Sequence, residues 1–305
     1  MNANPREQRL RRLEATPFAQ VNIVRRFFSG FGPSMREIFS RRELIGLLIG
    51  REVKAKYKDS TFGFAWSLAR PLLQLAIYFI AIGQILGAAR SVPDFAVFVF
   101  IGLTMWGFFS EIVSAGTVSI LGNAGLVKKI YLPREVFPIS AMGSAFVNFL
   151  TQFLVLVLAV IFLSSTRPAL DWQLLYVPIS ILVIMVFGLA ISLITSALNV
   201  YMRDTQYLVE VVLLLMFWLT PIVYSFTFVH DALKGSWLEQ LYLSSPVTVS
   251  MIAMQKAIWG AGSEGQYWPE DLSLMLGVSF LASCVLLFIA QRFFARVQGS
   301  FAQEL

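Results

Sequence analysis

The chain has 305 residues, of which 57% are hydrophobic and only 14% are charged. Soluble domains carry charge on roughly a quarter of their residues, so this composition argues against a soluble enzyme and is typical of an integral membrane protein. The formal net charge is +6. The single cysteine, Cys284, and the single histidine, His230, exclude an intrachain disulfide and a histidine-cluster metal site.

The first 33 residues are basic and interrupted by Pro and Gly, so we expect a loosely ordered cytoplasmic arm without the apolar core of a signal peptide. From Arg41 to Lys58, apolar side chains recur at helical spacing while Arg51 and Lys54 occupy another face. This pattern predicts an amphipathic helix in the membrane interface, whose basic face suits anionic lipid headgroups. A role as a membrane anchor alone fits the same pattern.

Six apolar stretches are long enough to cross a hydrocarbon core of about 30 Å. They are residues 66–87, 95–118, 139–163, 174–198, 208–226 and 272–290. With the N-terminus inside, 19 of the 24 Lys and Arg residues lie on the cytoplasmic side and 4 on the opposite side. Because Lys and Arg flanking spans stay preferentially in the cytoplasm, we predict that both termini are cytoplasmic.

The longest cytoplasmic connection between spans, residues 122–138, carries Lys128, Lys129 and Arg134 and has prolines at 133 and 138 that would stop a helix. This composition predicts one or two short helices on the cytoplasmic side.

A second set of short helices is predicted between the fifth and sixth spans. Ser245 and Pro246 are the residue types preferred at a helix N-cap and in its first turn, and Gly260 is placed to end that helix. Residues 247–259 extend only about 20 Å as a helix, which is too short to cross the membrane. A seventh span would also place the C-terminal arginines outside. We therefore predict a re-entrant outer hairpin of two helices, 236–243 and 246–259.

These predictions define an all-α integral membrane fold class: six transmembrane helices, an N-terminal amphipathic interface helix and a short outer re-entrant hairpin. Two parts follow, the basic arm and interface helix at 1–65 and the six-span domain at 66–305.

Three segments occur in a characteristic order. They are REVKAKYKDSTFGFAW at 51–66 with RPL at 70–72, LVKKIYLPREVFP at 126–138, and NVYMRD at 199–204 with PIVY at 221–224. In this order they resemble the type-2 ABC permeases that export polysaccharides, although Glu52 and Phe62 depart from the usual residues.

The resemblance implies the transmembrane subunit of an ATP-driven exporter for a lipid-linked polysaccharide, such as teichoic acid, O-antigen, capsule or cell-wall galactan, in the bacterial plasma membrane. It also implies a second copy of the chain, two separate ATPase subunits and no nucleic-acid partner or catalytic residue. The phosphate-binding pattern Gly-x-x-x-x-Gly-Lys-Ser/Thr is absent from the sequence. ATP and Mg²⁺ are therefore expected on the ATPase, and no cofactor is expected on this chain.

Coupling to an ATPase requires a cytoplasmic projection with docking charges. The candidates are Lys128, Lys129, Arg134, Glu135, Arg51 and Glu52. A pyrophosphate-linked headgroup needs cations at the inner leaflet, and the candidates are Lys54, Lys56, Lys58 and Arg70. Arg70 and Glu111 lie within apolar spans, where an unpaired charge is costly, so they are candidates for an ion pair. Two other interpretations compete with these roles. In one, the charges serve only to set the orientation of the chain in the membrane; in the other, Arg70 extends its side chain back to the cytoplasmic surface.

Two other functions compete with polysaccharide export. A type-2 ABC permease for a small molecule or a drug would have the same spans and would also depend on a separate ATPase. A membrane glycosyltransferase using a lipid-linked donor would need paired carboxylates or a base beside an outer cavity. Its candidates are Asp231, Glu239, Glu264, Glu270 and Asp271, which are interpreted more simply as a solvated acidic loop.

Overall fold

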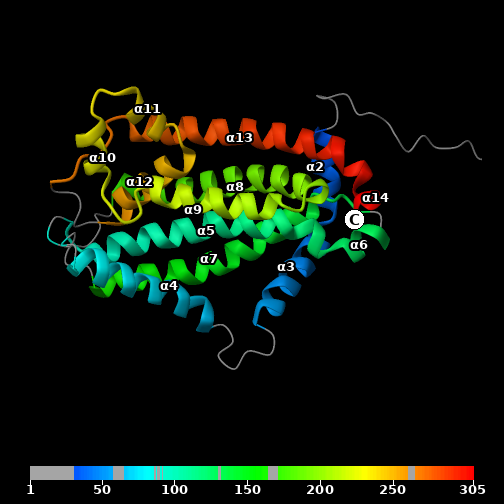
Figure 1. Cartoon of the computed structure of the whole chain (residues 1–305), viewed down its shortest axis with the longest axis horizontal. Helices are drawn as coiled ribbons and strands as arrows, with labels where there is room; N and C mark the ends of the chain where they lie inside the picture. The colour runs from blue at the N-terminus through cyan, green and yellow to red at the C-terminus, as the bar shows by residue number, and fades with distance from the viewer. Residues whose placement is uncertain are drawn as a thin grey trace, which may run out of the picture.

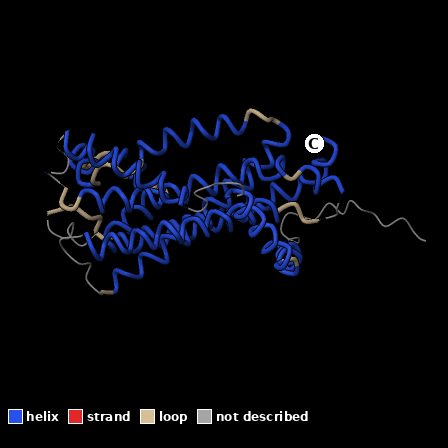
Figure 2. The backbone as a smooth tube through the Cα atoms, turned by 90° about the horizontal axis from the view of Figure 1, so that it is seen from below, coloured by secondary structure: helices blue, strands red, loops and turns tan. Residues whose placement is uncertain are grey.

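The structure is a computed structural model that describes residues 31–57, 65–85, 87, 90, 92–129, 132–163, 171–259 and 265–305. All regular structure in these residues is helical. The long helices lie side by side along the longest axis of the molecule (Figure 1, Figure 2). The all-helical character of the predicted fold class is confirmed for the described residues.

Within the described ranges, four helical segments are long and apolar enough to cross a membrane. They are α5 (Phe95–Gly122), α7 (Val136–Leu163), α8 (Tyr176–Tyr201) with the preceding 3-10 turn η3 (Trp172–Leu175), and α13 (Leu272–Val297). They correspond to the second, third, fourth and sixth predicted spans. Two shorter apolar segments correspond to the first and fifth: α4 (Ala65–Tyr78), which continues as the π-helical η1 (Phe79–Ile85), and α9 (Thr205–Leu219).

Helix α5 is the most buried of the four long helices and packs against α7 and α8. Its contact with α8 depends on small residues. A Cβ atom at Gly116 would lie 2.7 Å from Cβ of Ser192, and one at Gly188 would lie 3.0 Å from Cγ2 of Ile112. The two backbones can therefore approach closely because each helix has a glycine where the other presents a side chain.

The fifth apolar segment ends earlier than the sequence predicts. Helix α9 stops at Leu219, and the chain passes through residues 220–225 before α10 (Phe226–Leu233) begins. Pro221 explains this end, because proline has no N–H and its ring clashes with the preceding helical turn. The apolar stretch predicted at 208–226 is therefore helical only as far as Leu219.

The irregular segment after α9 is buried and finds its partners in neighbouring helices. Nε2 of Gln255 donates a hydrogen bond to the carbonyl of Pro221 at 2.7 Å. Gly102 in α5 leaves room for this segment, since a Cβ there would lie 2.9 Å from Cγ2 of Ile222. Irregular backbone at membrane depth is tolerated only with such protein partners.

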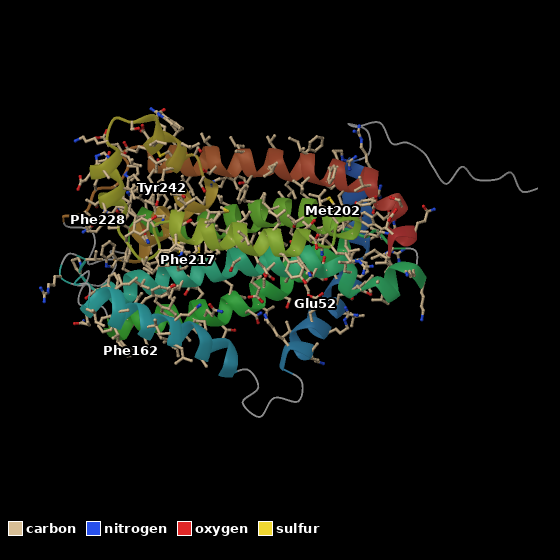
Figure 3. All side chains as sticks on the ribbon, in the orientation of Figure 1. Glu52, Phe162, Met202, Phe217, Phe228 and Tyr242 are labelled. Carbon is tan, nitrogen blue, oxygen red and sulfur yellow. The ribbon has the colours of Figure 1, made fainter. Side chains whose placement is uncertain are left out.

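The two short helices predicted after the fifth span are present as α11 (Trp237–Leu243) and α12 (Pro246–Ile258). The side chains of Ser236 and Ser245 cap them as expected. Helix α12 is almost wholly buried against α8, α13 and α5. Figure 3 labels Phe228 of α10 and Tyr242 of α11 at this end of the molecule, which we call the hairpin end. Gly260 lies outside the described residues.

The opposite end, which we call the basic end, gathers several short elements (Figure 1). They are α2 (Phe31–Ser40), α3 (Arg42–Tyr57), α6 (Ala124–Lys129), the 3-10 turn η5 (Gln298–Ser300) and α14 (Phe301–Glu304).

Two expectations about prolines at the basic end need correction. Residues 31–33 of the predicted arm belong to α2, and Pro138 lies inside the first turn of α7 instead of stopping a helix. In both cases a proline occupies the first turn of a helix, where the missing N–H has no intrahelical partner to lose. Residues 1–30 of the arm lie outside the described residues.

Helix α3 confirms the helix predicted at 41–58, but part of its apolar side packs on protein. Leu48 is buried, and a Cβ at Gly143 of α7 would lie 2.9 Å from Cγ1 of Ile49. Leu47 is 72% exposed and remains available to lipid. The contact with α7 fixes α3 on the bundle and so fixes the charged residues in its last turns.

We predict that Gly116→Ala destabilises the protein by about 1–3 kcal/mol, because an added methyl group forces α5 away from α8. Gly277→Ala in α13 is the matched control, since no atom lies within 4 Å of a Cβ placed there. Thermal unfolding of the two purified variants in detergent measures the difference. Equal melting temperatures would contradict the close α5–α8 contact.

Candidate functional site

A groove of about 450 Å³ lies where α3, α5 and α7 meet. Its charged lining comes from Arg51, Glu52 and Lys56 of α3 and Glu111 of α5. Figure 3 labels Glu52 on α3, at the side of the bundle. Glu111 precedes the end of α5 at Gly122 by about 16 Å of helix. The groove therefore extends from the basic end toward the middle of the bundle.

Glu111 is the point at which three helices are tied together. Lys56 of α3 forms an ion pair with Oε1 of Glu111, and Nδ2 of Asn148 in α7 donates a hydrogen bond to the same oxygen at 2.6 Å. The side chain of Lys56 is 47% exposed and that of Glu111 is 24% exposed. An anion entering the groove can therefore reach the ammonium group of Lys56.

The pair expected from the sequence, Arg70 with Glu111, stays a prediction. The side chain of Arg70 lies outside the described part of the structure, as does Lys58. Within the described part, Glu111 is bound by Lys56 and Asn148.

Arg51 and Glu52 also face the groove, although the sequence predicts them as contacts to an ATPase. Arg51 donates a hydrogen bond to Oδ1 of Asn123, and Oγ of Ser140 donates to Oε1 of Glu52 at 3.1 Å. Burial raises the pKa of Glu52, against the opposing effects of the Ser140 hydrogen bond and the nearby charge of Arg51. Lys54 is exposed and is not one of the residues that line the groove.

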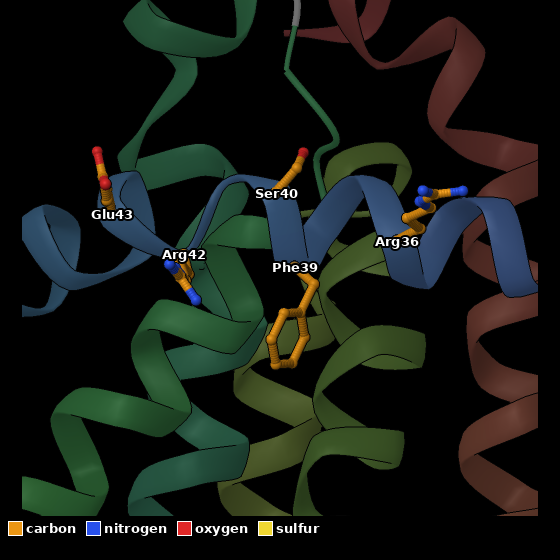
Figure 4. Close-up of a pocket in the computed structure, with 5 residues that line it drawn as sticks. All are labelled: Arg36, Phe39, Ser40, Arg42 and Glu43. Carbon is orange, nitrogen blue, oxygen red and sulfur yellow. The ribbon is translucent and has the colours of Figure 1, made fainter.

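A smaller hollow of about 390 Å³ lies at the junction of α2 and α3. Its lining residues are Arg36, Phe39, Ser40, Arg42 and Glu43 (Figure 4). Figure 4 shows Phe39 and Arg42 projecting to the side opposite Ser40 and Glu43. An exposed aromatic ring beside two arginines has the residue types that suit a membrane surface.

Helix α6 presents Lys128 and Lys129 to solvent, as the predicted cytoplasmic projection requires. On its inner side Val127 is buried in an apolar cluster that includes Phe137 of α7 and Phe294 of α13. Asn123 joins α5 to α6, and it is the same residue that accepts the hydrogen bond from Arg51. Asn123 therefore connects the groove, through Arg51, to the helix that carries the exposed lysines.

The C-terminal segment packs behind α6. Phe301 is fully buried, with its ring 5.5 Å from that of Phe294, and the guanidinium of Arg134 lies 5.7 Å from the centre of the Phe301 ring. The backbone N–H of Arg134 donates to Oε1 of Gln298 at 3.4 Å. We call Arg134, Gln298 and Phe301 the C-terminal brace, because they fix Arg134, which precedes α7, to the segment that follows α13.

Glu135 is buried, although the sequence predicts it as a docking residue on the surface. Its side chain is 1% exposed, and its Oε1 accepts hydrogen bonds from Nε2 of Gln298 at 3.3 Å and of Gln291 at 3.5 Å. Its Oε2 has no hydrogen-bond partner among the described residues. Burial raises the pKa of Glu135 and so favours the neutral carboxyl. The apolar residues that follow it, Val136 and Phe137, are the sequence feature that indicates this burial.

Comparison with known proteins agrees with the resemblance found in the sequence. The ABC-2 type transporter family matches residues 43–259. The O-antigen export system permease protein RfbA of Myxococcus xanthus is 29% identical over 272 residues, which cover 89% of this chain and 98% of the relative. A protein of the same name from Klebsiella pneumoniae is 32% identical over 196 residues, which cover 64% of this chain and 73% of the relative.

The family match extends from α3 into the end of α12. It therefore includes the groove, the tie at Glu111, α6 and the buried break after α9. The chain belongs to the ABC-2 type transporter family.

Proposed function

We propose that this chain is the transmembrane subunit of an ABC exporter that moves a lipid-linked polysaccharide out across the bacterial plasma membrane. The observation that carries the proposal is that the charged groove and α6, which carries the exposed lysines, are joined by Asn123: this residue connects α5 to α6 and accepts a hydrogen bond from Arg51 of the groove. The relatives named O-antigen export permeases, one of them aligned over nearly its full length, support a polysaccharide as the substrate.

In this proposal the chain crosses the membrane six times, with the basic end and both termini in the cytoplasm. The spans are the four long helical segments together with α4–η1 and α9. Helix α9 covers about 22 Å, less than a hydrocarbon core of about 30 Å, and the buried segment 220–225 continues it. The hairpin of α11 and α12 then lies in the outer leaflet, where the burial of α12 protects its backbone from lipid.

The groove between α3, α5 and α7 is the proposed entrance for the substrate headgroup. Arg51 and Lys56 provide two cations within one groove. The planar guanidinium of Arg51 suits the oxygens of a phosphate group, and the ammonium of Lys56 acts as a second point charge. Lys54 lies on the exposed side of α3 and contributes to the attraction of anionic headgroups to this end.

The motor is proposed to be a separate ATPase that binds ATP and Mg²⁺, with two ATPase chains serving two copies of this permease. Lys128 and Lys129 are the docking charges of α6. The C-terminal brace holds Arg134 against the segment that follows α13, and Val127 of α6 packs in the same apolar cluster as Phe294 of α13, so a displacement of α6 is transmitted to the spans.

A transferase function has less support. Among the candidate carboxylates, Glu239 forms an ion pair with His230 and not with a second carboxylate. This arrangement links α10 to α11 and is explained as a structural contact. A small-molecule permease is less favoured because the relatives are named for O-antigen export.

We predict that Lys56→Gln lowers glycan export by about fivefold, the equivalent of roughly 1 kcal/mol of lost headgroup attraction. Lys54→Gln, two residues away on the same helix but outside the groove, should change export by less than about twofold, as for a solvated surface charge. ATP-dependent export is measured in cells that rely on the variant, normalised to the amount of permease in the membrane. Equal effects of the two substitutions would contradict a headgroup site in the groove.

Reversing the charge of both exposed lysines in α6 tests the docking site. Lys128→Glu with Lys129→Glu should reduce export and the permease-dependent ATPase activity by about tenfold or more, because two attractions become repulsions. Insertion into the membrane should be unchanged. Lys234→Glu, at the hairpin end, is the control for an added acidic charge. Normal export by the double variant would remove α6 from the mechanism.

Phe301→Ala tests the C-terminal brace. A spin label on Lys129→Cys in a Cys284→Ser background should become more mobile in this variant, and export should fall while ATP hydrolysis becomes independent of substrate. The control is Gln303→Ala, which changes an exposed residue of the same short helix. Unchanged label mobility in Phe301→Ala would show that the C-terminal segment does not position α6.

A further inference from the structure

We infer that Glu111 makes the groove select headgroups with two negative charges over headgroups with one. This inference rests on the proposed headgroup site and assigns a separate role to its acidic residue. The observation behind it is the ion pair between Lys56 and Glu111, which lies inside the groove and not on an unrelated surface.

The two cations of the groove differ in what they are bound to. Arg51 donates to the side-chain oxygen of Asn123, a neutral amide. Lys56 is bound to the carboxylate of Glu111. An anion that binds Arg51 replaces a neutral acceptor and gains charge attraction. An anion that binds Lys56 has to replace another anion, so it gains little unless it brings more charge or a second contact.

This difference separates two classes of lipid. A phosphodiester headgroup carries one negative charge, which Arg51 can satisfy while the Lys56–Glu111 pair stays closed. A headgroup joined to its lipid through a diphosphate diester carries two negative charges. One can engage Arg51 while the other competes with Glu111 for Lys56. Glu111 thus weakens the binding of singly charged headgroups to Lys56. A site gains specificity in this way when a competing ligand can make the same attractive contacts.

Asn148 allows this competition to be reversible. Its side chain is 2% exposed, and its Nδ2 donates to Oε1 of Glu111 at 2.6 Å. Glu111 therefore retains a hydrogen-bond donor when Lys56 turns to the substrate, and its carboxylate stays in place to bind Lys56 again after release. The same pair ties α3 to α5, so only the doubly charged headgroup loosens that connection.

The test compares two lipids that differ by one phosphate: a polyprenyl diphospho-N-acetylglucosamine and a polyprenyl phospho-N-acetylglucosamine of equal chain length. Their affinities are measured for the full-length permease in nanodiscs of uncharged phosphatidylcholine. The variant is Glu111→Gln, whose side-chain oxygen can still accept from Asn148. Glu52→Gln is the matched control, because Glu52 is a carboxylate of the same groove whose hydrogen bond comes from Ser140 and on which the charge of Lys56 has only a minor effect.

We expect the wild-type chain to prefer the diphosphate lipid, and Glu111→Gln to narrow that preference about fivefold by binding the monophosphate lipid more tightly, as for loss of an exposed ion pair. The preference should persist in Glu52→Gln. An unchanged preference in Glu111→Gln, or weaker binding of both lipids, would refute the role of Glu111 while leaving the headgroup site intact. Failure of the wild-type chain to bind either lipid would refute the headgroup site itself, and this inference with it.

Discussion

The arrangement of this bundle depends on one constraint: a polar group that a helix carries into an apolar environment costs free energy unless it finds a partner inside the protein. The constraint is met at widely separated places. Gln255 binds the carbonyl of Pro221 where α9 breaks, and serine side chains cap α11 and α12. Glu111 receives both Lys56 and Asn148. The positions of the short helices follow from these contacts as much as from apolar packing.

Packed long helices connect the two ends of the molecule. Helix α13 packs against α12 at the hairpin end and carries Phe294, which contacts Phe301, at the basic end. Helix α8 packs against α13 along its length and closes on α5 at Gly116. A displacement applied at α6 therefore meets packed helices with small contact residues. Such helices move as bodies or slide past one another, and they do not bend locally.

Much of the fold could be predicted from apolar length and cap residues, and the failures have identifiable causes. Four long helices follow from hydropathy, and Ser236 and Ser245 mark α11 and α12. The end of α9 was obscured because the apolar run continues past Pro221 although the helix cannot. The contact of Lys56 with Glu111 and the hydrogen bonds of Glu135 involve residues far away in the sequence. The sequence pattern did not indicate Lys56 as a partner of Glu111, whereas Val136 and Phe137 indicate the burial of Glu135.

Asn123 belongs both to the groove and to the junction between α5 and α6. Under the proposed function, this residue links headgroup binding to the docking of the ATPase. Asn123 ends α5 and precedes α6, its Oδ1 accepts from Arg51, and its Nδ2 donates to the carbonyl of Ser119 at 2.8 Å. A movement of α6 that shifts Asn123 removes the partner of Arg51 and leaves that guanidinium to the headgroup. A headgroup that captures Arg51 likewise frees Asn123 from α3. Linkage requires these two effects to be reciprocal, so in the proposed exporter headgroup binding and ATPase docking would influence each other through the Arg51–Asn123 hydrogen bond.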